Sequence, residues 1–551
     1  MNKLRLIIIH ILLTICGFTA RAQNIVTVDT SIQHQRITGW EAMGWMANFD
    51  TPWQIAHLDD WNDSVANACA DIGINRIRLE VRSGAENPID YFTQYITGQI
   101  SRTAWKAQWY NSINDNGNSA IVNDTGFHFS ETIYTMEKVV IPLKNAVETL
   151  GKKFYLNLNY VDFDQGSSVP FEHYNNPDEY AEFMLACFDT LQNRFGFTPD
   201  AIEIILEPEN SIWGTGNVGT TIGNAISAAG DTLSAHGYFP DFIAPSSMLP
   251  ANATPWTDTI LMNPNAANYL TEVSYHKYGA KPISTLQSIC NVATTNNITS
   301  SMLEWWNDNN DQYELYRDLT YACVSAWQCG IMAEVNSGAN PNTSILMNID
   351  DSDTANPVIN ENPKARYYRQ YFKYIPTGAV RIDATVSGPH QVTAYKDTLN
   401  REIVVINAQY ADSFSIAGLS DGTYGITYST VSENGTQLPD VIISGGNNLN
   451  VSIPNEGVIT VFDKDIFTGL AEEETVNGFK IFPNPVSNYL HIQTNSFNLS
   501  SIEVYNLLGA KLNTYPKTNI IDLSALQSGI YIIIFYDIKG RTVDYQKVVK
   551  R

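Results

Sequence analysis

The chain has 551 residues, 44% of them hydrophobic and 16% charged, with 33 Lys and Arg against 57 Asp and Glu and a formal net charge of −24 at pH 7. Such acidity argues against nucleic acid or an anionic membrane surface as a partner, because both select basic patches. The length exceeds the roughly 250–300 residues that one hydrophobic core usually supports, so several domains are expected.

Residues 1–22 are typical of a secretory signal peptide. Lys3 and Arg5 form a positive n-region, Leu6 to Ala20 an apolar core, and Ala20-Arg21-Ala22 a small-x-small cleavage site. No later segment offers about 18 consecutive apolar residues, so we expect export without a stable membrane span. A signal anchor is the alternative. Removing the signal leaves 30 Lys and Arg against 57 Asp and Glu, a net charge of −27.

Cysteine usage says little about function. Five cysteines remain after Cys16 leaves with the signal, namely Cys69, Cys187, Cys290, Cys323 and Cys329. The number of cysteines is odd, and the sequence has neither a CxxC motif nor histidines clustered at metal-binding spacing. We therefore expect no structural zinc and no metal at the active site. Most of these cysteines lie in apolar, helix-like contexts where buried free thiols are usual. One disulfide is compatible with this pattern, whereas a disulfide scaffold is not.

Residues 23–380 alternate short apolar strands with helical patterns. The eight candidate strands are 36–40, 76–79, 154–159, 202–207, 241–244, 272–276, 301–304 and 331–335, and helical stretches between them include 142–150, 177–194 and 312–327. Eight such units over this length predict an α/β fold, a (β/α)8 TIM barrel. A doubly wound open sheet is the alternative, and the lack of a Gly-rich loop after an early strand disfavours it.

Two of these strands end in glutamates. The apolar run from Ala201 leads to Glu207, and Pro208 cannot continue a sheet ladder, so the strand should end with the carboxylate at its carboxyl edge. Ser301-Met302-Leu303-Glu304 repeats the arrangement. Active sites of barrels lie at this edge. Other polar residues predicted at the same edge are Arg78, Asn157, Asn159, His276, Lys277 and Tyr278.

A pair of carboxyl groups at one barrel mouth is what retaining glycoside cleavage requires. One carboxylate acts as nucleophile and the other carboxyl as acid, about 5–5.5 Å apart. Arg78 could keep Glu304 ionised, and the charge of Glu304 would then help to hold a proton on Glu207. The alternative is that both glutamates are solvated surface groups.

Aromatic residues near the strand ends are expected to supply sugar-stacking platforms, since rings bury much area at low entropic cost. They are Trp45, Trp213, Tyr278, Trp305 and Trp306. Core packing is the alternative for each. The long insertion from Gly84 to Glu131 is expected to shape one wall of the cleft, because loops of this length in compact domains are usually functional.

These motifs resemble the retaining clan A glycoside hydrolases, in which the acid/base glutamate follows strand four and the nucleophile ends strand seven. Gln35-Arg36-Ile37-Thr38-Gly39-Trp40 and the segment from Ala365 to Ile382 resemble glycoside hydrolase family 30 in particular, over residues 24–465. The resemblance implies that Glu207 is the acid/base and Glu304 the nucleophile. It also implies that Arg78 and His276-Lys277-Tyr278 line the subsite of the cleaved sugar, with no cofactor.

The chain departs from the clan pattern at Leu206, where the clan usually has the Asn that binds the sugar 2-hydroxyl. Such a contact strengthens in the transition state. Either Asn157 or Asn159 replaces it, or the sugar is bound differently there. Glu209, beyond the proline, is the second candidate for the acid.

Residues 381–465 alternate in the manner of a β-sandwich side domain, which the strand at Asn24 to Val28 is expected to join. A rigid buttress is favoured over a sugar-binding module. Residues 466–477 are predicted to be a linker. Residues 478–551, all β, resemble the C-terminal sorting domain of the type IX secretion system, through Phe479 to Val486, Ile502 to Gly509 and the closing Val548-Val549-Lys550-Arg551. An Ig-like sugar-binding module is the alternative.

The predicted function is therefore that of a secreted or cell-surface retaining glycoside hydrolase, exported by the type IX machinery and expected to be a monomer. Its substrate would be a polysaccharide or oligosaccharide. A non-catalytic surface glycan-binding protein on a barrel scaffold is the alternative. The sequence does not choose among β-1,6-glucan, β-1,6-galactan, xylan, and exo-acting glucosidase or fucosidase activity.

Overall fold

The computed structural model describes residues 23–49, 51–164, 170–306, 311–335, 344–353, 356–464, 479–482, 486, 488–494, 499–506, 510–537 and 542–551. The predicted signal peptide and the predicted linker lie outside these residues. The chain forms two compact units, Met1–Ile466 and Phe467–Arg551.

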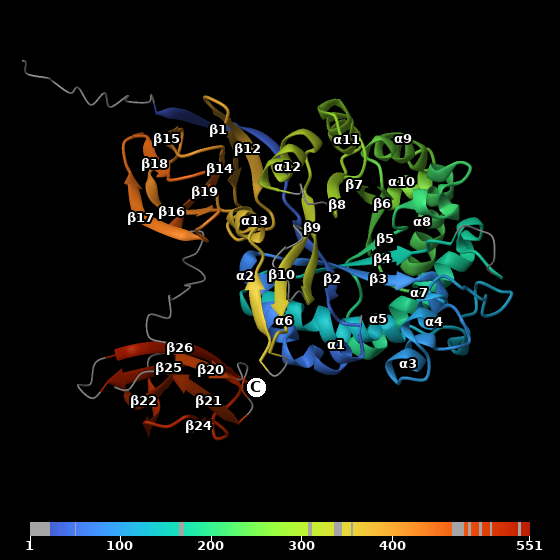
Figure 1. Ribbon diagram of the computed structural model, residues 1–551, viewed down its shortest axis with the longest axis horizontal. Helices are drawn as coiled ribbons and strands as arrows, with labels where there is room; N and C mark the ends of the chain where they lie inside the picture. The colour runs from blue at the N-terminus through green and yellow to red at the C-terminus, as the bar shows by residue number, and fades with distance from the viewer. Residues whose placement is uncertain are drawn as a thin grey trace, which may run out of the picture. The chain divides into compact units, whose positions relative to one another are not determined.

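The first unit contains a closed barrel of eight parallel strands (Figure 1). In barrel order they are β2 (Gly39–Met46), β3 (Arg76–Arg82), β4 (Tyr155–Val161), β5 (Ala201–Glu203), β6 (Asp241–Ser247), β7 (Leu270–His276), β8 (Thr299–Glu304) and β9 (Ala326–Val335). Pairing of β9 with both β8 and β2 closes the sheet. The predicted barrel is confirmed, and closure excludes the open doubly wound sheet. A short extension, β10 (Ile345–Asp350) and β11 (Val358–Glu361), continues from β9.

Amphipathic helices surround the barrel, including α2 (Asn62–Ile72), α6 (Ile141–Thr149), α7 (Pro177–Phe195), α8 (Val218–Ala235), α9 (Pro250–Ile260) and α11 (Ile283–Thr295). Pro177 begins α7 and Gly196, at φ 77°, ends it, as the sequence predicts to within one residue. The helix predicted over 312–327 ends sooner. α12 (Gln312–Arg317) passes into a π-helical turn, and Cys323, at φ 53°, turns the chain toward β9.

The strand that leads to Glu207 is shorter than predicted. Regular pairing in β5 stops at Glu203, four residues before Glu207. The N–H groups of Ile204, Leu206 and Glu207 then bond to carbonyls on alternate sides, those of the β6, β4 and β6 segments. The chain therefore still reaches the carboxyl edge of the barrel, but irregularly, and Glu207 adopts a left-handed conformation with φ 43°.

The side domain is a curled sheet of nine strands around its own apolar core. Its strands are β1 (Asn24–Arg36), β12 (Val380–Val386), β13 (Gln391–Lys396), β14 (Glu402–Ala408), β15 (Asp412–Ala417), β16 (Gly422–Thr430), β17 (Thr436–Ile443), β18 (Leu449–Ile453) and β19 (Gly457–Asp463). As expected, the N-terminal strand joins this sheet, antiparallel to β12 and parallel to β15. α13 (Ala365–Phe372) connects it to the barrel, since Tyr371 donates to Asn407 at 2.9 Å and Phe372 stacks on Trp40 of β2.

The second unit consists of β strands throughout its described residues. One sheet contains β20 (Phe479–Phe482), β21 (Tyr489–Thr494) and β24 (Ile520–Asp522), and the other β22 (Leu499–Asn506), β23 (Lys511–Pro516), β25 (Gly529–Asp537) and β26 (Thr542–Lys550). Val504, Ile533 and Phe535 lie in its core. Across the described part of the chain, no helix is long and apolar enough to span a bilayer.

One disulfide joins Cys290 of α11 to Cys323, with 5.1 Å between the Cα atoms. It connects the segments that precede and follow β8, the strand that ends in Glu304. Cys69 and Cys187 are buried and are not disulfide-bonded. A disulfide suits the oxidising environment that an exported protein meets.

Replacing both Cys290 and Cys323 with Ser should lower the free energy of unfolding by about 3–4 kcal/mol, because the bridge closes a loop with a sequence separation of 33. Thermal denaturation with and without reductant measures this. The wild type should lose stability on reduction and the double variant should not respond. A wild-type Tm that is unchanged by reductant would contradict the prediction.

Candidate active site

Glu207 and Glu304 meet at the carboxyl ends of the barrel strands, with His276 between them. One carboxylate oxygen of each glutamate and one ring nitrogen of His276 all lie within 4.8 Å of one another. Glu207 is 7% exposed, Glu304 9% and His276 fully buried. Two carboxyl groups nearly 100 residues apart in the chain thus face one small space. The alternative of solvated surface glutamates does not fit this burial.

Glu304 ends β8 and is held by two donors. Arg78 of β3 donates Nη2–H to Glu304 Oε2 at 2.5 Å, and the Tyr278 hydroxyl donates to Oε1 at 2.9 Å. Burial alone would raise the pKa of this carboxyl. The charges of Arg78 and His276 and the hydrogen bonds from Arg78 and Tyr278 prevail and hold the pKa of Glu304 below its ordinary value. Glu304 is therefore a carboxylate at neutral pH.

Glu207 is oriented by a turn rather than by a strand. Its left-handed backbone conformation is uncommon for a residue with a Cβ and is typical of strained functional sites. His276 Nδ1 lies 2.8 Å from Oε1, and the Asn210 amide donates to Oε2 at 2.6 Å. Both carboxylate oxygens are thereby fixed. Sequence reasoning did not select Asn210, although its position three residues after Glu207 in the same turn was a usable signal.

His276 is buried among three carboxylates. Its Nε2 lies 3.3 Å from Ser246 Oγ and 3.9 Å from Glu203 Oε1, and Ser246 in turn donates to Glu203. Burial would lower the pKa of His276, but the charge of Glu304 and the hydrogen bonds to Glu203 and Glu207 raise it to about 9. The ring is thus a cation at neutral pH. Burial opposes ionisation of Glu203, yet His276 and Arg78 lower the pKa of Glu203.

Beneath this layer the barrel interior is ionic. Arg76 of β3 pairs with Glu41 of β2 at 2.9 Å and with Glu272 of β7 at 3.0 Å, and all three side chains are at most 5% exposed. Burial, together with the charge of Glu203, raises the pKa of Glu41 even though Arg76 opposes the rise. Asn157 donates to Glu203 at 3.0 Å. This hydrogen bond joins the lower layer of Arg76, Glu41 and Glu272, which we call the floor, to the layer of the two glutamates.

Asn157 and Asn159, the two residues expected to replace the Asn that the clan usually has at the position of Leu206, differ in their surroundings. Asn157 already donates to Glu203 and lies within 3.5 Å of Glu41. Asn159, two residues farther along the same face of β4 and nearer the mouth, is fully buried, and among the described residues neither its amide nitrogen nor its oxygen has a partner. Asn157 Oδ1 also lacks a partner among the described residues, but only Asn159 has both its donor and its acceptor free.

Two predicted roles are corrected by the structure. Lys277 does not line the sugar site, because successive strand residues face opposite sides: its ammonium is buried against Asp318 at 2.8 Å and Glu314 at 2.6 Å. Glu209 is not free to act as the acid. Its carboxylate accepts hydrogen bonds from the backbone N–H groups of Met248 and Leu249, which directly follow β6.

The aromatic residues divide into packed and accessible ones. Trp213 is fully buried and donates to Asp162, and Trp305 is 3% exposed beneath Lys281, so neither is a sugar platform. Trp306 is 38% exposed, and its backbone N–H donates to the Tyr278 hydroxyl at 3.2 Å. Trp45 is half-buried in a cavity that Arg78 also lines.

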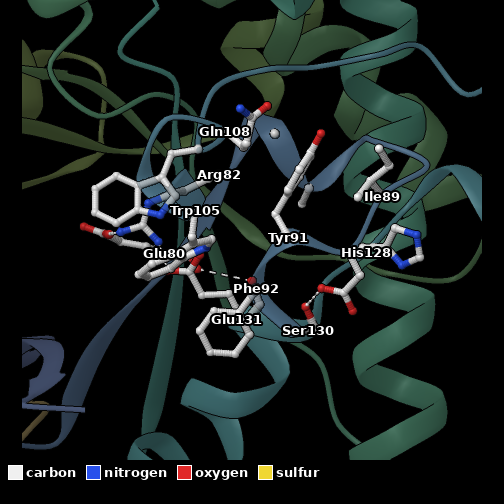
Figure 2. A pocket seen from close by; sticks show the side chains of 15 residues that line it. Glu80, Arg82, Ile89, Tyr91, Phe92, Trp105, Gln108, His128, Ser130 and Glu131 are labelled. Carbon is white, nitrogen blue, oxygen red and sulfur yellow. Dashed lines mark hydrogen bonds and ion pairs between the residues drawn. The ribbon is translucent and has the colours of Figure 1, made fainter. Parts of the chain in front are cut away.

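That cavity adjoins another formed largely by the insertion (Figure 2). Both are lined by Glu80, Arg82 and Glu131, which form an ion-paired set. The second cavity is also lined by Tyr91, Gln108, Trp109, His128 and Ser130, and the Arg82 guanidinium stacks on Trp109 at 4.0 Å. Residues of the insertion therefore line a polar, aromatic space beside Arg78.

Solved structures share this fold. The catalytic domain of the glycoside hydrolase family 30 xylanase C from Talaromyces cellulolyticus matches with TM-score 0.56 and 15% identity, over 80% of this chain and 99% of that one. The family 30 endoxylanase from Clostridium papyrosolvens C71 gives 0.54 and 16%, over 80% and 99%. The endo-β1,6-glucanase BT3312 gives 0.52 and 13%, over 80% and 94%. No curated protein sequence matches significantly.

Residues 480–551 match the family model described as a secretion system C-terminal sorting domain. The predicted sorting domain is thereby confirmed, and such a domain implies the type IX secretion machinery as a partner. The chain is a secreted or cell-surface protein that carries this sorting domain together with a barrel and side domain of the glycoside hydrolase family 30 fold.

Proposed function

We propose that this protein is a retaining glycoside hydrolase that cleaves β-glycosidic bonds in a polysaccharide. The observation that carries the proposal is the close approach of Glu207 and Glu304, which bring one carboxylate oxygen each to within 4.8 Å of one another. Inverting enzymes need about 6.5–9.5 Å to admit a water between the carboxyl groups, whereas retaining enzymes bring them to about 5–5.5 Å.

Glu304 is the nucleophile. Its lowered pKa keeps it ionised, and Arg78 and Tyr278 fix the orientation of its oxygens. In the first step one oxygen of Glu304 attacks the anomeric carbon, and the bond to the leaving oxygen breaks as a proton reaches that oxygen. Water then attacks the glycosyl–Glu304 ester and releases the sugar with its original configuration.

Glu207 delivers the proton. Glu203, Glu207 and Glu304 bring three negative charges, and Arg78 and His276 two positive charges, so one additional proton makes the cluster neutral. The pKa values of Glu203 and Glu304 are lowered, and the mechanism places this proton on Glu207. After the leaving group departs, Glu207 takes a proton from the attacking water. His276 and Asn210 position Glu207 for both transfers.

The substrate is a β-linked glucan, galactan or xylan, with Trp306 and Trp45 as stacking surfaces and Asn159 as the ligand for the sugar 2-hydroxyl. This assignment rests on the exposure of Trp306, the shared cavity of Trp45 and Arg78, and the unpaired amide of Asn159. A glycan-binding protein without activity is the competing function. Two closely apposed, mostly buried acids favour the enzyme, because binding alone gains nothing from them.

Glu304→Gln should reduce kcat by about 10⁴-fold or more, because the nucleophile is lost. Glu207→Gln should lose about 10²–10⁴-fold on polysaccharide, and less on aryl glycosides whose leaving groups need no acid. Glu209→Gln is the matched control in the same turn and should keep most activity. The assay uses a panel of aryl glycosides, β-1,6-glucan, β-1,6-galactan and xylan. NMR of the first product should show retained configuration.

Inverted products would refute the double displacement. A wild type that binds one of these polysaccharides and cleaves none would establish the glycan-binding alternative instead.

Tyr278→Phe should lower kcat/KM by about 10–100-fold, the effect of one hydrogen bond to a charged group. Its hydroxyl helps to keep the pKa of Glu304 low, so its loss should raise that pKa and move the acid limb of the kcat/KM profile to higher pH. The alkaline limb, which reports loss of the proton that is transferred to the leaving group, should stay in place. An acid limb that does not move would contradict the role of Tyr278.

Trp306→Ala should raise KM about 5–10-fold, the value of one aromatic stacking contact, with kcat and Tm nearly unchanged. Trp305→Ala should instead lower Tm, since Trp305 is 3% exposed and packs internally. Steady-state kinetics and thermal denaturation of both variants test this. Equal loss of Tm in the two variants would show that Trp306 packs internally as well.

A further inference from the structure

Three carboxylates meet outside the active site, between the insertion and α7. Asp115 lies in the insertion, and Glu179 and Glu182 lie on one face of α7, three residues apart. One oxygen from each of the three lies within 4.8 Å of the others. Like charges at this spacing on a helix destabilise it, so the cluster calls for a compensating charge.

The carboxylate of Glu182 is buried and unsatisfied. The residue is 1% exposed, and among the described residues no donor other than a carboxyl of this cluster reaches either of its oxygens. One oxygen of Asp115 and one of Glu179 are in the same state. The part of the chain that the structure describes provides no ion pair to any of the three. Buried carboxylates without donors or counter-charge are strongly unfavourable.

Asp115 is held in place independently of the other two acids. Its Oδ2 accepts the Asn116 side-chain amide at 2.8 Å and the Asn123 N–H at 2.7 Å, while its own N–H donates to Glu86 at 2.9 Å. A Cβ on Gly126 would come within 2.2 Å of the Asp115 Cβ, so only glycine allows this packing. The partners of Oδ2 leave Oδ1 unengaged, as a fixed oxygen for a ligand.

We propose that Asp115, Glu179 and Glu182 bind one Ca²⁺ ion that fastens the insertion to α7. Ca²⁺ is a hard cation that takes 6–8 oxygens at about 2.3–2.6 Å, so oxygens up to about 4.8 Å apart fit on one coordination sphere. Bidentate carboxylates and water complete the sphere. All three ligands are carboxylates, which favours Ca²⁺ over zinc, a metal that prefers sulfur and imidazole.

The location of the protein fits a weak site of this kind. The sorting domain marks the chain as secreted or cell-surface, and extracellular Ca²⁺ modules work with Kd values of about 10⁻⁴–10⁻³ M. The insertion that the ion would fasten also provides Trp109, His128 and Glu131 to the cavities beside Arg78. Ca²⁺ would thereby hold one wall of the substrate cleft against the barrel.

The test is a Ca²⁺ titration of metal-free full chain, followed by calorimetry and by thermal denaturation. One Ca²⁺ per chain should bind with a Kd of about 1 mM or below, and Tm should rise by several degrees at saturation. Proteolysis within residues 84–131 should slow as Ca²⁺ is added. Mg²⁺, and NaCl at matched ionic strength, should give much smaller effects.

Glu182→Gln and Asp115→Asn should each weaken Ca²⁺ binding at least about tenfold, because each removes one of three ligand charges. Without Ca²⁺, Glu182→Gln should be as stable as the wild type or more so, because in the described part of the chain Glu182 has no ion pair to lose. Asp178→Asn, an exposed neighbour in the first turn of α7, is the matched control and should bind like the wild type. Absence of binding by the wild type at about 10 mM Ca²⁺, or unchanged affinity in both ligand variants, would overturn the proposal.

Discussion

The buried ion pair between Arg78 and Glu304 is the interaction on which the rest of the site depends. Barrel interiors are normally filled by layers of branched apolar side chains, but here arginines, glutamates and asparagines occupy β2 to β5 and β7. Buried charges are tolerated only when each is paired, and removing one partner leaves an uncompensated charge at about 3–5 kcal/mol. In the layer below, Arg76 pairs with Glu41 and Glu272, so that the buried charges there are compensated in the same way.

Glu203 connects these two layers. One of its oxygens accepts from Asn157 of the floor and the other from Ser246 beside His276. The positively charged ring of His276 therefore interacts with three carboxylates: Glu203 in the barrel interior, and Glu207 and Glu304 at the mouth. This arrangement makes the electrostatics of the mouth a property of the whole barrel interior, so that changes in the layer below Glu304 would reach it through charge and hydrogen bonding.

Structure outside the barrel stabilises the segments that present the two glutamates. The disulfide ties together the chain on either side of β8, and the insertion lines the cavities next to Arg78. Glu207, by contrast, lies in a strained turn, and its carboxylate is held there by Asn210 and His276. Strain of this kind, of order 1–3 kcal/mol, persists only where the surroundings determine it, and here it aims the carboxylate at Glu304.

Local pattern was enough to predict the number of strands, the barrel and the presence of Glu207, Glu304, Arg78, His276 and Tyr278 at one edge, because neighbouring residues determine hydrophobic periodicity and where a strand ends. The sorting domain was predicted from its resemblance to a known domain. It was not enough to separate Trp306 from Trp305 and Trp213, or to exclude Lys277 from the mouth, since the side that a residue faces after a strand ends depends on packing. Glu203 and Ser246 looked like ordinary strand residues until their neighbours across the barrel were known. The carboxylate cluster of Asp115, Glu179 and Glu182 joins residues some 64 positions apart, and only the folded chain brings such charges together.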